Sequence, residues 1–189
     1  DNGMLYELFN AFPQKDGTWK ADSGAIFSLK SNELRKDSWT SADAAGLPIF
    51  PGLIRYDEVL QGSINHAIRF TTNQTKKEYV WPARHAASSL TEDKYPPMGQ
   101  RFRLKSTFDS SSYSKEMKVI ITALQTYGMI LADNGSPWYL SGAPDDRWDN
   151  DMLRQLKKIK GSDFEAVDCA SLMVSKDSGA VKKSEARGK

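Results

Sequence analysis

Short stretches with the composition of β-strands recur along most of this chain, and residues that favour turns separate them. Many of them alternate apolar and polar side chains, a period that gives a strand one buried and one exposed face. We expect strands at 4–9, 18–20, 25–29, 66–71, 78–81, 101–105, 129–132, 138–140 and 164–167. The first three predict an antiparallel meander, and Asn134-Gly135 predicts a hairpin between 129–132 and 138–140.

Two longer stretches have helical periodicity instead. The first begins at Ser114, a residue type that caps helices, and ends at Gly128. The second begins near Asp149 and ends before Gly161, with acidic residues first and lysines last, as the helix dipole favours. Strands and helices do not alternate regularly. The pattern therefore predicts an α+β, β-rich fold, with an antiparallel sheet or sandwich and two main helices packed against it.

The length of 189 residues is typical of one domain. We expect a single globular domain over 1–174 and a disordered basic tail over 175–189, where apolar residues are few. The loop 31–53 contains enough apolar residues to predict that it is packed, and a short helix closed by Gly62 should follow at 56–61. The chain enters its first strand almost at once, which we interpret as the start of a processed or truncated product.

The charge balance excludes some partners. The chain has 26 Lys and Arg against 24 Asp and Glu, and they are spread out, so it lacks the basic surface that binds nucleic acid. No apolar stretch reaches the length of about 18 residues that a membrane span needs. Cys169 is the only cysteine, which rules out a disulfide within the chain and predicts a packed thiol. Phosphate-binding loops, nucleophile elbows and zinc motifs are missing.

Polar residues gather at three places near the ends of expected elements. The first group comprises Arg55, Asp57 and Glu58 on the short helix, with His66 and Arg69 on the strand that follows. A carboxylate and an imidazole on adjacent elements can exchange protons with a substrate. A helix cap with surface ion pairs would use the same residues.

The second group is Arg84 and His85, in the loop after Trp81-Pro82. Arg84 could hold an anionic ligand through two parallel hydrogen bonds, although an ordinary exposed loop has the same composition. His66 and His85 are the only histidines. With one carboxylate they could form a divalent metal site, but their spacing gives no support for one, so we expect no cofactor.

The third group follows the strand at 129–132 and comprises Asp133, Asn134, Trp138 and Trp148. Aromatic rings beside polar groups suit a sugar, because the ring stacks on the sugar face while polar groups hold its hydroxyls. The competing interpretation is that most of these rings are core residues.

Four stretches carry a family resemblance: SADAAGLP at 41–48, PGLIRYDEV at 51–59, WPARH at 81–85 and YGMILADNGS at 127–136. They resemble parts of a family of uncharacterised secreted bacterial proteins, chiefly from soil bacteria. The resemblance covers roughly residues 1–173 and brings no activity with it. It implies an extracellular location, with which the glycosylation sequon Asn73-Gln74-Thr75 is compatible.

We therefore expect a secreted protein that acts on polysaccharide, as a glycoside hydrolase or a lyase. Its candidate catalytic residues are Asp57, Glu58, His66, His85 and Asp133. Its candidate binding residues are Arg55, Arg69, Arg84, Asn134, Trp138 and Trp148. A non-catalytic carbohydrate-binding or adhesive domain, or a structural domain of an extracellular assembly, is the alternative. The enzyme hypothesis requires that folding gathers these groups into one site.

Overall fold

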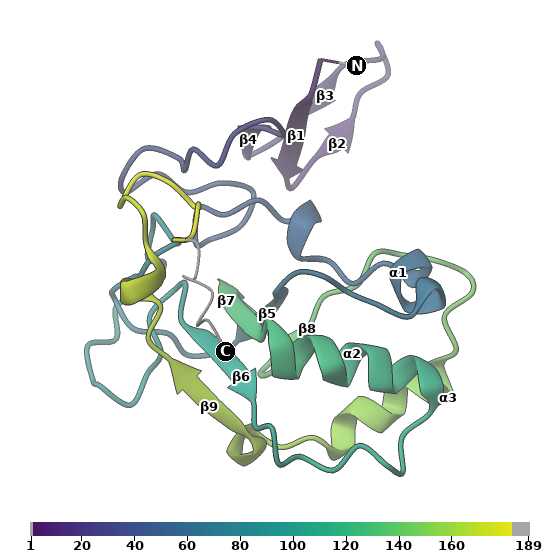
Figure 1. The fold of residues 1–189 in the computed structure, drawn as a ribbon. Helices are drawn as coiled ribbons and strands as arrows, with labels where there is room; N and C mark the ends of the chain where they lie inside the picture. Colours follow the sequence, from purple (N-terminus) through teal and green to yellow (C-terminus); the bar gives the residue numbers. More distant parts are fainter. Residues whose placement is uncertain (1, 183–189) are drawn as a thin grey trace.

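The N-terminal part of the chain forms one long hairpin. The computed structural model describes residues 2–182, and in it β1 (Met4–Phe9) pairs antiparallel with β4 (Ser23–Ser28), and β2 (Phe12–Pro13) with β3 (Trp19–Lys20). The register runs on unchanged from one pair to the other, and Asn10, with φ of 52°, interrupts the strand between them. The expected meander is therefore a single interrupted hairpin that projects from the body (Figure 1).

The body is built on a five-stranded sheet in the order β8-β5-β7-β6-β9. Its strands are β5 (Ile68–Thr72), β6 (Arg101–Leu104), β7 (Met129–Asn134), β8 (Tyr139–Leu140) and β9 (Phe164–Val167). β5 and β7 run parallel, and the other pairs are antiparallel. The fold is thus β-rich and contains helices, as expected, but its main sheet is mixed rather than purely antiparallel.

The predicted hairpin between β7 and β8 is wrong. β5 and β6 occupy the two sides of β7, so the returning strand has no free edge of β7 to pair with. It pairs with β5 instead, where Tyr139 lies opposite Thr71. The expected strand at 78–81 is only an isolated bridge between Tyr79 and Met98.

Among residues 2–182, three α-helices lie beside the sheet: α1 (Tyr56–Gln61), α2 (Lys115–Thr126) and α3 (Asn150–Leu153). α2 confirms the predicted cap, because Ser114 accepts a hydrogen bond from Met117 N, and it presents the expected apolar face to the core. The second predicted helix is only a short α-helix followed by the 3₁₀ turn η2 (Arg154–Lys158), although its apolar residues do pack on the core. The remaining 3₁₀ turns are η1 (Phe50–Gly52), η3 (Gly161–Asp163) and η4 (Ala170–Leu172).

The long loop between β4 and α1 is packed, as expected. Ser41, Asp43, Ala45 and Leu47 are buried in it. Ala45 belongs to the same core cluster as the strands β5 and β7. The loop therefore carries a buried carboxyl group into the sheet.

Part of the predicted disordered tail is ordered. The backbone of Gly179 donates to Asn32 O at 2.7 Å, and Val181 forms a bridge with Met173. Arg84 also binds this segment, so polar anchoring replaces the apolar packing that its composition lacks. The rest of that prediction, at 183–189, lies outside the described residues. In the part of the chain that the structure describes, no helix is long and apolar enough to cross a membrane.

Candidate functional site

The carboxyl ends of β5 and β7 lie side by side because these strands are parallel. In open sheets with parallel strands, ligands bind in the crevice outside these carboxyl ends. Asp133, near the end of β7, is in register with Thr71 of β5. The loop 41–47 packs against the same end of the sheet, where Ala45 N donates to Ala132 O at 2.8 Å.

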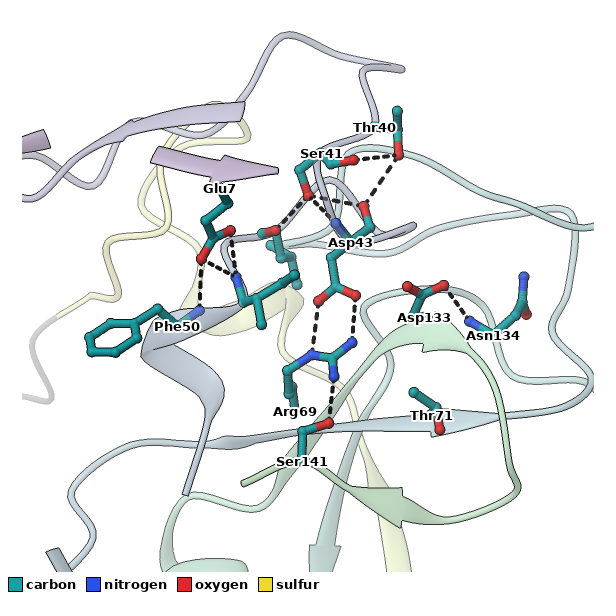
Figure 2. Close-up of polar contacts among 12 residues, drawn as sticks. Glu7, Thr40, Ser41, Asp43, Phe50, Arg69, Thr71, Asp133, Asn134 and Ser141 are labelled. Atoms are coloured by element: carbon teal, nitrogen blue, oxygen red, sulfur yellow. Dashed lines mark hydrogen bonds and ion pairs between the residues drawn. The ribbon is translucent and has the colours of Figure 1, made fainter. Parts of the chain in front are cut away.

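Asp43 lies in this loop, and Arg69 of β5 binds its carboxyl group. Arg69 Nε donates to Asp43 Oδ2 at 3.0 Å, and Arg69 Nη2 donates to Asp43 Oδ1 at 2.6 Å. Arg69 Nη1 donates to the Ser141 hydroxyl, which follows β8. The Asp43 side chain is 0% exposed and that of Arg69 14% exposed, so this ion pair is buried. Through Arg69, it joins the loop to β5 and to the segment that follows β8 (Figure 2).

The carboxyl group of Asp133 faces that of Asp43 (Figure 2). Burial raises the pKa of Asp43 to about 7, and the charge of Asp133 and its hydrogen bond add to the rise, while Arg69 opposes it. Two neighbouring carboxyl groups resist ionising together and tend to hold one proton between them. Because Asp133 is half-buried whereas Asp43 is enclosed, Asp133 is the member that can meet a substrate.

Two further predicted residues adjoin the segments that carry this pair. Asn134 Nδ2 donates to Ala87 O at 2.7 Å, and its Oδ1 accepts from Thr75 Oγ1 at 2.9 Å. His85 Nδ1 lies 2.8 Å from the carbonyl oxygen of Ala44, the neighbour of Asp43. Since a carbonyl only accepts, Nδ1 carries the hydrogen of this bond. Folding thus brings Asp133, Asn134 and His85 to the Asp43 loop.

An exposed aromatic residue extends the site along the sheet edge. Tyr139 lies opposite Thr71 in the antiparallel pair of β8 and β5, and Thr71 lies opposite Asp133. Side chains of residues that are paired across neighbouring strands lie on the same face of a sheet. Tyr139 is 67% exposed, so its ring is available on the face that carries Asp133.

The first predicted cluster lies elsewhere, at the start of α1, and its side chains bond to one another and to nearby groups. Glu58 accepts from the backbone N–H of Arg55 at 3.2 Å and pairs with its guanidinium, which caps the helix. His66 Nε2 lies 3.2 Å from Glu58 Oε1. Asp57 is exposed and pairs with Arg147 at 2.8 Å. These groups form a cap and surface ion pairs, and only Arg69 of the predicted cluster reaches the carboxyl pair.

The two tryptophans predicted to bind sugar are packing residues. Trp138 stacks on Phe70 with ring centroids 5.5 Å apart and also contacts Phe164. Trp148 packs against the core, meets Tyr56 edge to face, and donates through Nε1 to a backbone carbonyl. Trp138 remains 42% exposed, but its ring packs with Phe70, whose side chain lies on the face of β5 opposite to Thr71 and its partner Asp133.

Arg84 is buried and acts as a clamp rather than a ligand-binding group. Its Nε donates to Arg35 O at 2.7 Å, and its Nη1 donates to Lys176 O at 2.8 Å. Its Nη2 pairs with Asp177 at 2.8 Å. One guanidinium therefore ties the segment 175–182 to the loop before Asp43.

Replacing Arg84 with Met is expected to release this segment. The Lys176 carbonyl would lose its donor, and Asp177 its partner, so the peptide bond after Lys176 should become accessible to trypsin. Limited trypsin digestion followed by mass spectrometry should show cleavage there about ten times faster than in the wild type. Arg154→Met, which removes an exposed ion pair, is the control. Equal cleavage rates in both variants would contradict the clamp.

No metal site joins the two histidines. Among residues 2–182, no three His, Cys, Asp or Glu side chains are grouped so that they could hold a metal ion. Two surface hollows also lie away from the carboxyl pair, one of about 530 Å³ beside Arg147 and one of about 540 Å³ beside Trp81. The candidate site therefore lies at the carboxyl ends of β5 and β7 and not in either of these hollows.

Asp43 is the residue that sequence reasoning missed. It lies in a short Ala-rich stretch of the loop 31–53, which was expected to be packed but was given no functional residue. The informative signal was that its neighbours Ala42, Ala44 and Ala45 are small and apolar, because an acid that shares their burial requires a cation as its partner. That cation is Arg69, 26 positions further on.

Comparison with protein-family models, with curated proteins and with solved structures finds no match to this chain.

Proposed function

We propose that this chain is a secreted glycan hydrolase in which Asp133 is the catalytic acid–base group and Asp43 is its buried proton partner. One observation carries this function: a half-buried carboxyl group faces an enclosed one whose pKa is raised to about 7. Strongly shifted pKa values that arise from burial and a specific charged neighbour are concentrated at functional sites.

The pair can supply a base near neutral pH. Because the raised pKa places the proton of the pair on Asp43, the half-buried Asp133 is the member that would meet water and act as the base. Carboxyl groups that flank a glycosidic bond lie about 5 to 9.5 Å apart. Asp43 and Asp133 face each other directly, so they do not act from opposite sides of a bond. Asp43 is a positioning residue, and His85 is the candidate acid for the leaving group.

The surroundings of Asp133 favour a glycan as substrate. Tyr139 offers an exposed ring on the same face, and the exposed Ser136 follows the end of β7, after Asn134, whose amide already bonds Ala87 O and Thr75 Oγ1. Rings stack on sugar faces while amides and hydroxyls bind their hydroxyl groups. An open edge also accommodates a long chain. The resemblance to secreted bacterial proteins supports an extracellular site of action.

A glycan-binding domain without catalysis is the second candidate. Both oxygens of Asp43 already accept hydrogen bonds from Arg69, as they would if this carboxyl group only fastened the loop to the sheet. This candidate keeps the role of Tyr139 but gives Asp133 no chemical step.

Release of reducing ends from a panel of polysaccharides tests the proposal. We expect turnover of at least one glycan by the wild type, and a loss of about 10²- to 10⁴-fold in kcat for Asp133→Asn, the range for removing an acid–base group. Asp57→Asn is the matched control, because Asp57 is an exposed, ion-paired acid on another element.

Two results would count against catalysis. Glycan binding without turnover, in wild type and Asp133→Asn alike, would select the binding domain. Neither binding nor turnover on any glycan would remove both candidates.

A further inference from the structure

The N-terminal hairpin exposes an uncharged apolar face. Tyr6 is 59% exposed, Leu8 53% and Ile26 57%, and Met4 lies on the same side of the ribbon. The opposite face is fixed to the body: Ala25 is buried there. Scattered exposed apolar side chains need no explanation, but a contiguous patch of them marks an interaction surface.

The same hairpin also has an unpaired edge. In β1, the carbonyl of Phe9 accepts from Asp22 on the side of β4, so the odd-numbered residues of β1 bond toward β4. Alternation along a strand then turns the N–H and C=O groups of Met4, Tyr6 and Leu8 toward the other edge. Among residues 2–182, only Met4 N has a partner on that edge, the side chain of Asn2. An open, apolar strand edge is a template for another strand.

We propose that a second copy of this chain covers the edge, with the two β1 strands antiparallel and Tyr6 opposite Tyr6. In this register Tyr6 of each copy donates to and accepts from Tyr6 of the other. Met4 exchanges the same bonds with Leu8, with Met4 N turning from the Asn2 side chain to the Leu8 carbonyl of the other copy. The two ribbons then form one continuous four-stranded sheet. The apolar face continues across the junction, because the register keeps even-numbered residues on one side.

Complementarity of charge and of hydrogen bonds favours this occupant and this register. In β1 and β4 the outer face carries no charged residue, so two copies meet there without repulsion; it comprises Met4, Tyr6, Leu8, Gly24, Ile26 and Ser28. On the inner face Glu7 lies opposite Leu5 of the other copy, whereas a register centred on Glu7 would oppose two carboxylates. That register is also excluded because the backbone groups of Glu7 already face β4. Of the registers that centre on Met4, Tyr6 or Leu8, the one on Tyr6 overlaps the strands most.

Light scattering during size-exclusion chromatography and cysteine cross-linking test the proposal with the full chain. We expect a dimer whose fraction grows with concentration, and Tyr6→Lys should make it monomeric, because two ammonium groups would lie opposite each other. Leu60→Lys, at an exposed apolar residue of α1, should leave the dimer unchanged.

The register has its own test. Under oxidation, Tyr6→Cys should form a covalent dimer about ten times faster than Leu8→Cys, because only residue 6 lies opposite itself within disulfide distance. The natural Cys169 is buried and serves in both variants as background.

Three outcomes would overturn the inference. A monomer at every concentration would show that a second copy does not cover the edge. A dimer that survives Tyr6→Lys would show that the copies meet at another surface. Equal cross-linking by both cysteine variants would refute the register. Circular dichroism establishes that each variant is folded before it is scored.

Discussion

Raising the pH from about 4.5 to about 8 is expected to lower the free energy of unfolding by roughly 3 to 4 kcal/mol. The cause is Asp43, whose pKa burial raises from the ordinary 3.8 to about 7. Between these two values the folded protein binds a proton that the unfolded chain has released. The stabilisation is complete below the ordinary pKa and is lost as the pH rises through about 7.

Other acids of the chain affect a different range of pH. Hydrogen bonds from Arg147 lower the pKa of Asp145 to about 2, and Asp16, Asp93 and Asp109 also have lowered pKa values. A lowered pKa stabilises the fold above the ordinary value and loses this effect in acid. These groups therefore act mainly below pH 4, outside the range in which Asp43 titrates.

Urea unfolding over a pH series measures the effect. Asp43→Asn cannot ionise, so its stability should stay nearly constant between about pH 4.5 and 8. Asp57→Asn should keep the wild-type slope, because Asp57 is exposed and far from the pair. An undiminished slope in Asp43→Asn would show that another group titrates.

Arg69→Met is expected to cost about 3 to 5 kcal/mol at pH 8, the usual cost of removing one partner of a buried ion pair. Asp43 would then be a buried charge without its two nitrogen donors. At pH 5 Asp43 carries its own proton, so the cost should be smaller. The comparison of the two pH values separates loss of charge pairing from loss of packing.

Arg147→Met is the matched control for this variant. Arg147 also pairs with two carboxylates, but its side chain is 48% exposed. Exposed ion pairs contribute about 0 to 1 kcal/mol. If chemical denaturation gave both arginine variants equal losses at pH 8, the Asp43–Arg69 pair would have no special role.

Local rules predicted the elements whose signals are local. β1 has the predicted bounds, α1 ends at Gly62 in the left-handed conformation, and α2 begins at its Ser cap. They failed where a distant strand decided the outcome. Asn134-Gly135 does turn the chain, but β5 pairs with the side of β7 that a hairpin would need. No pattern near residue 134 predicts that pairing.

The candidate site shows the same division. Asp133, Asn134 and Arg69 were predicted because they lie at strand positions and ends that sequence can recognise. Glu58 and His66 had an equally good pattern, yet they serve a helix cap. Asp43 became identifiable only through its contacts, since its burial depends on Arg69 and its raised pKa partly on Asp133.

Carbon-13 NMR titration of the aspartate carboxyl carbons observes the pair itself. In the wild type, the Asp43 carboxyl should titrate near pH 7, and Asp133→Asn should move its midpoint downward, because the charge and hydrogen bond of Asp133 help to raise the pKa of Asp43. A carboxyl of Asp43 that titrates near its ordinary 3.8, with no response to Asp133→Asn, would show that the two acids share no proton.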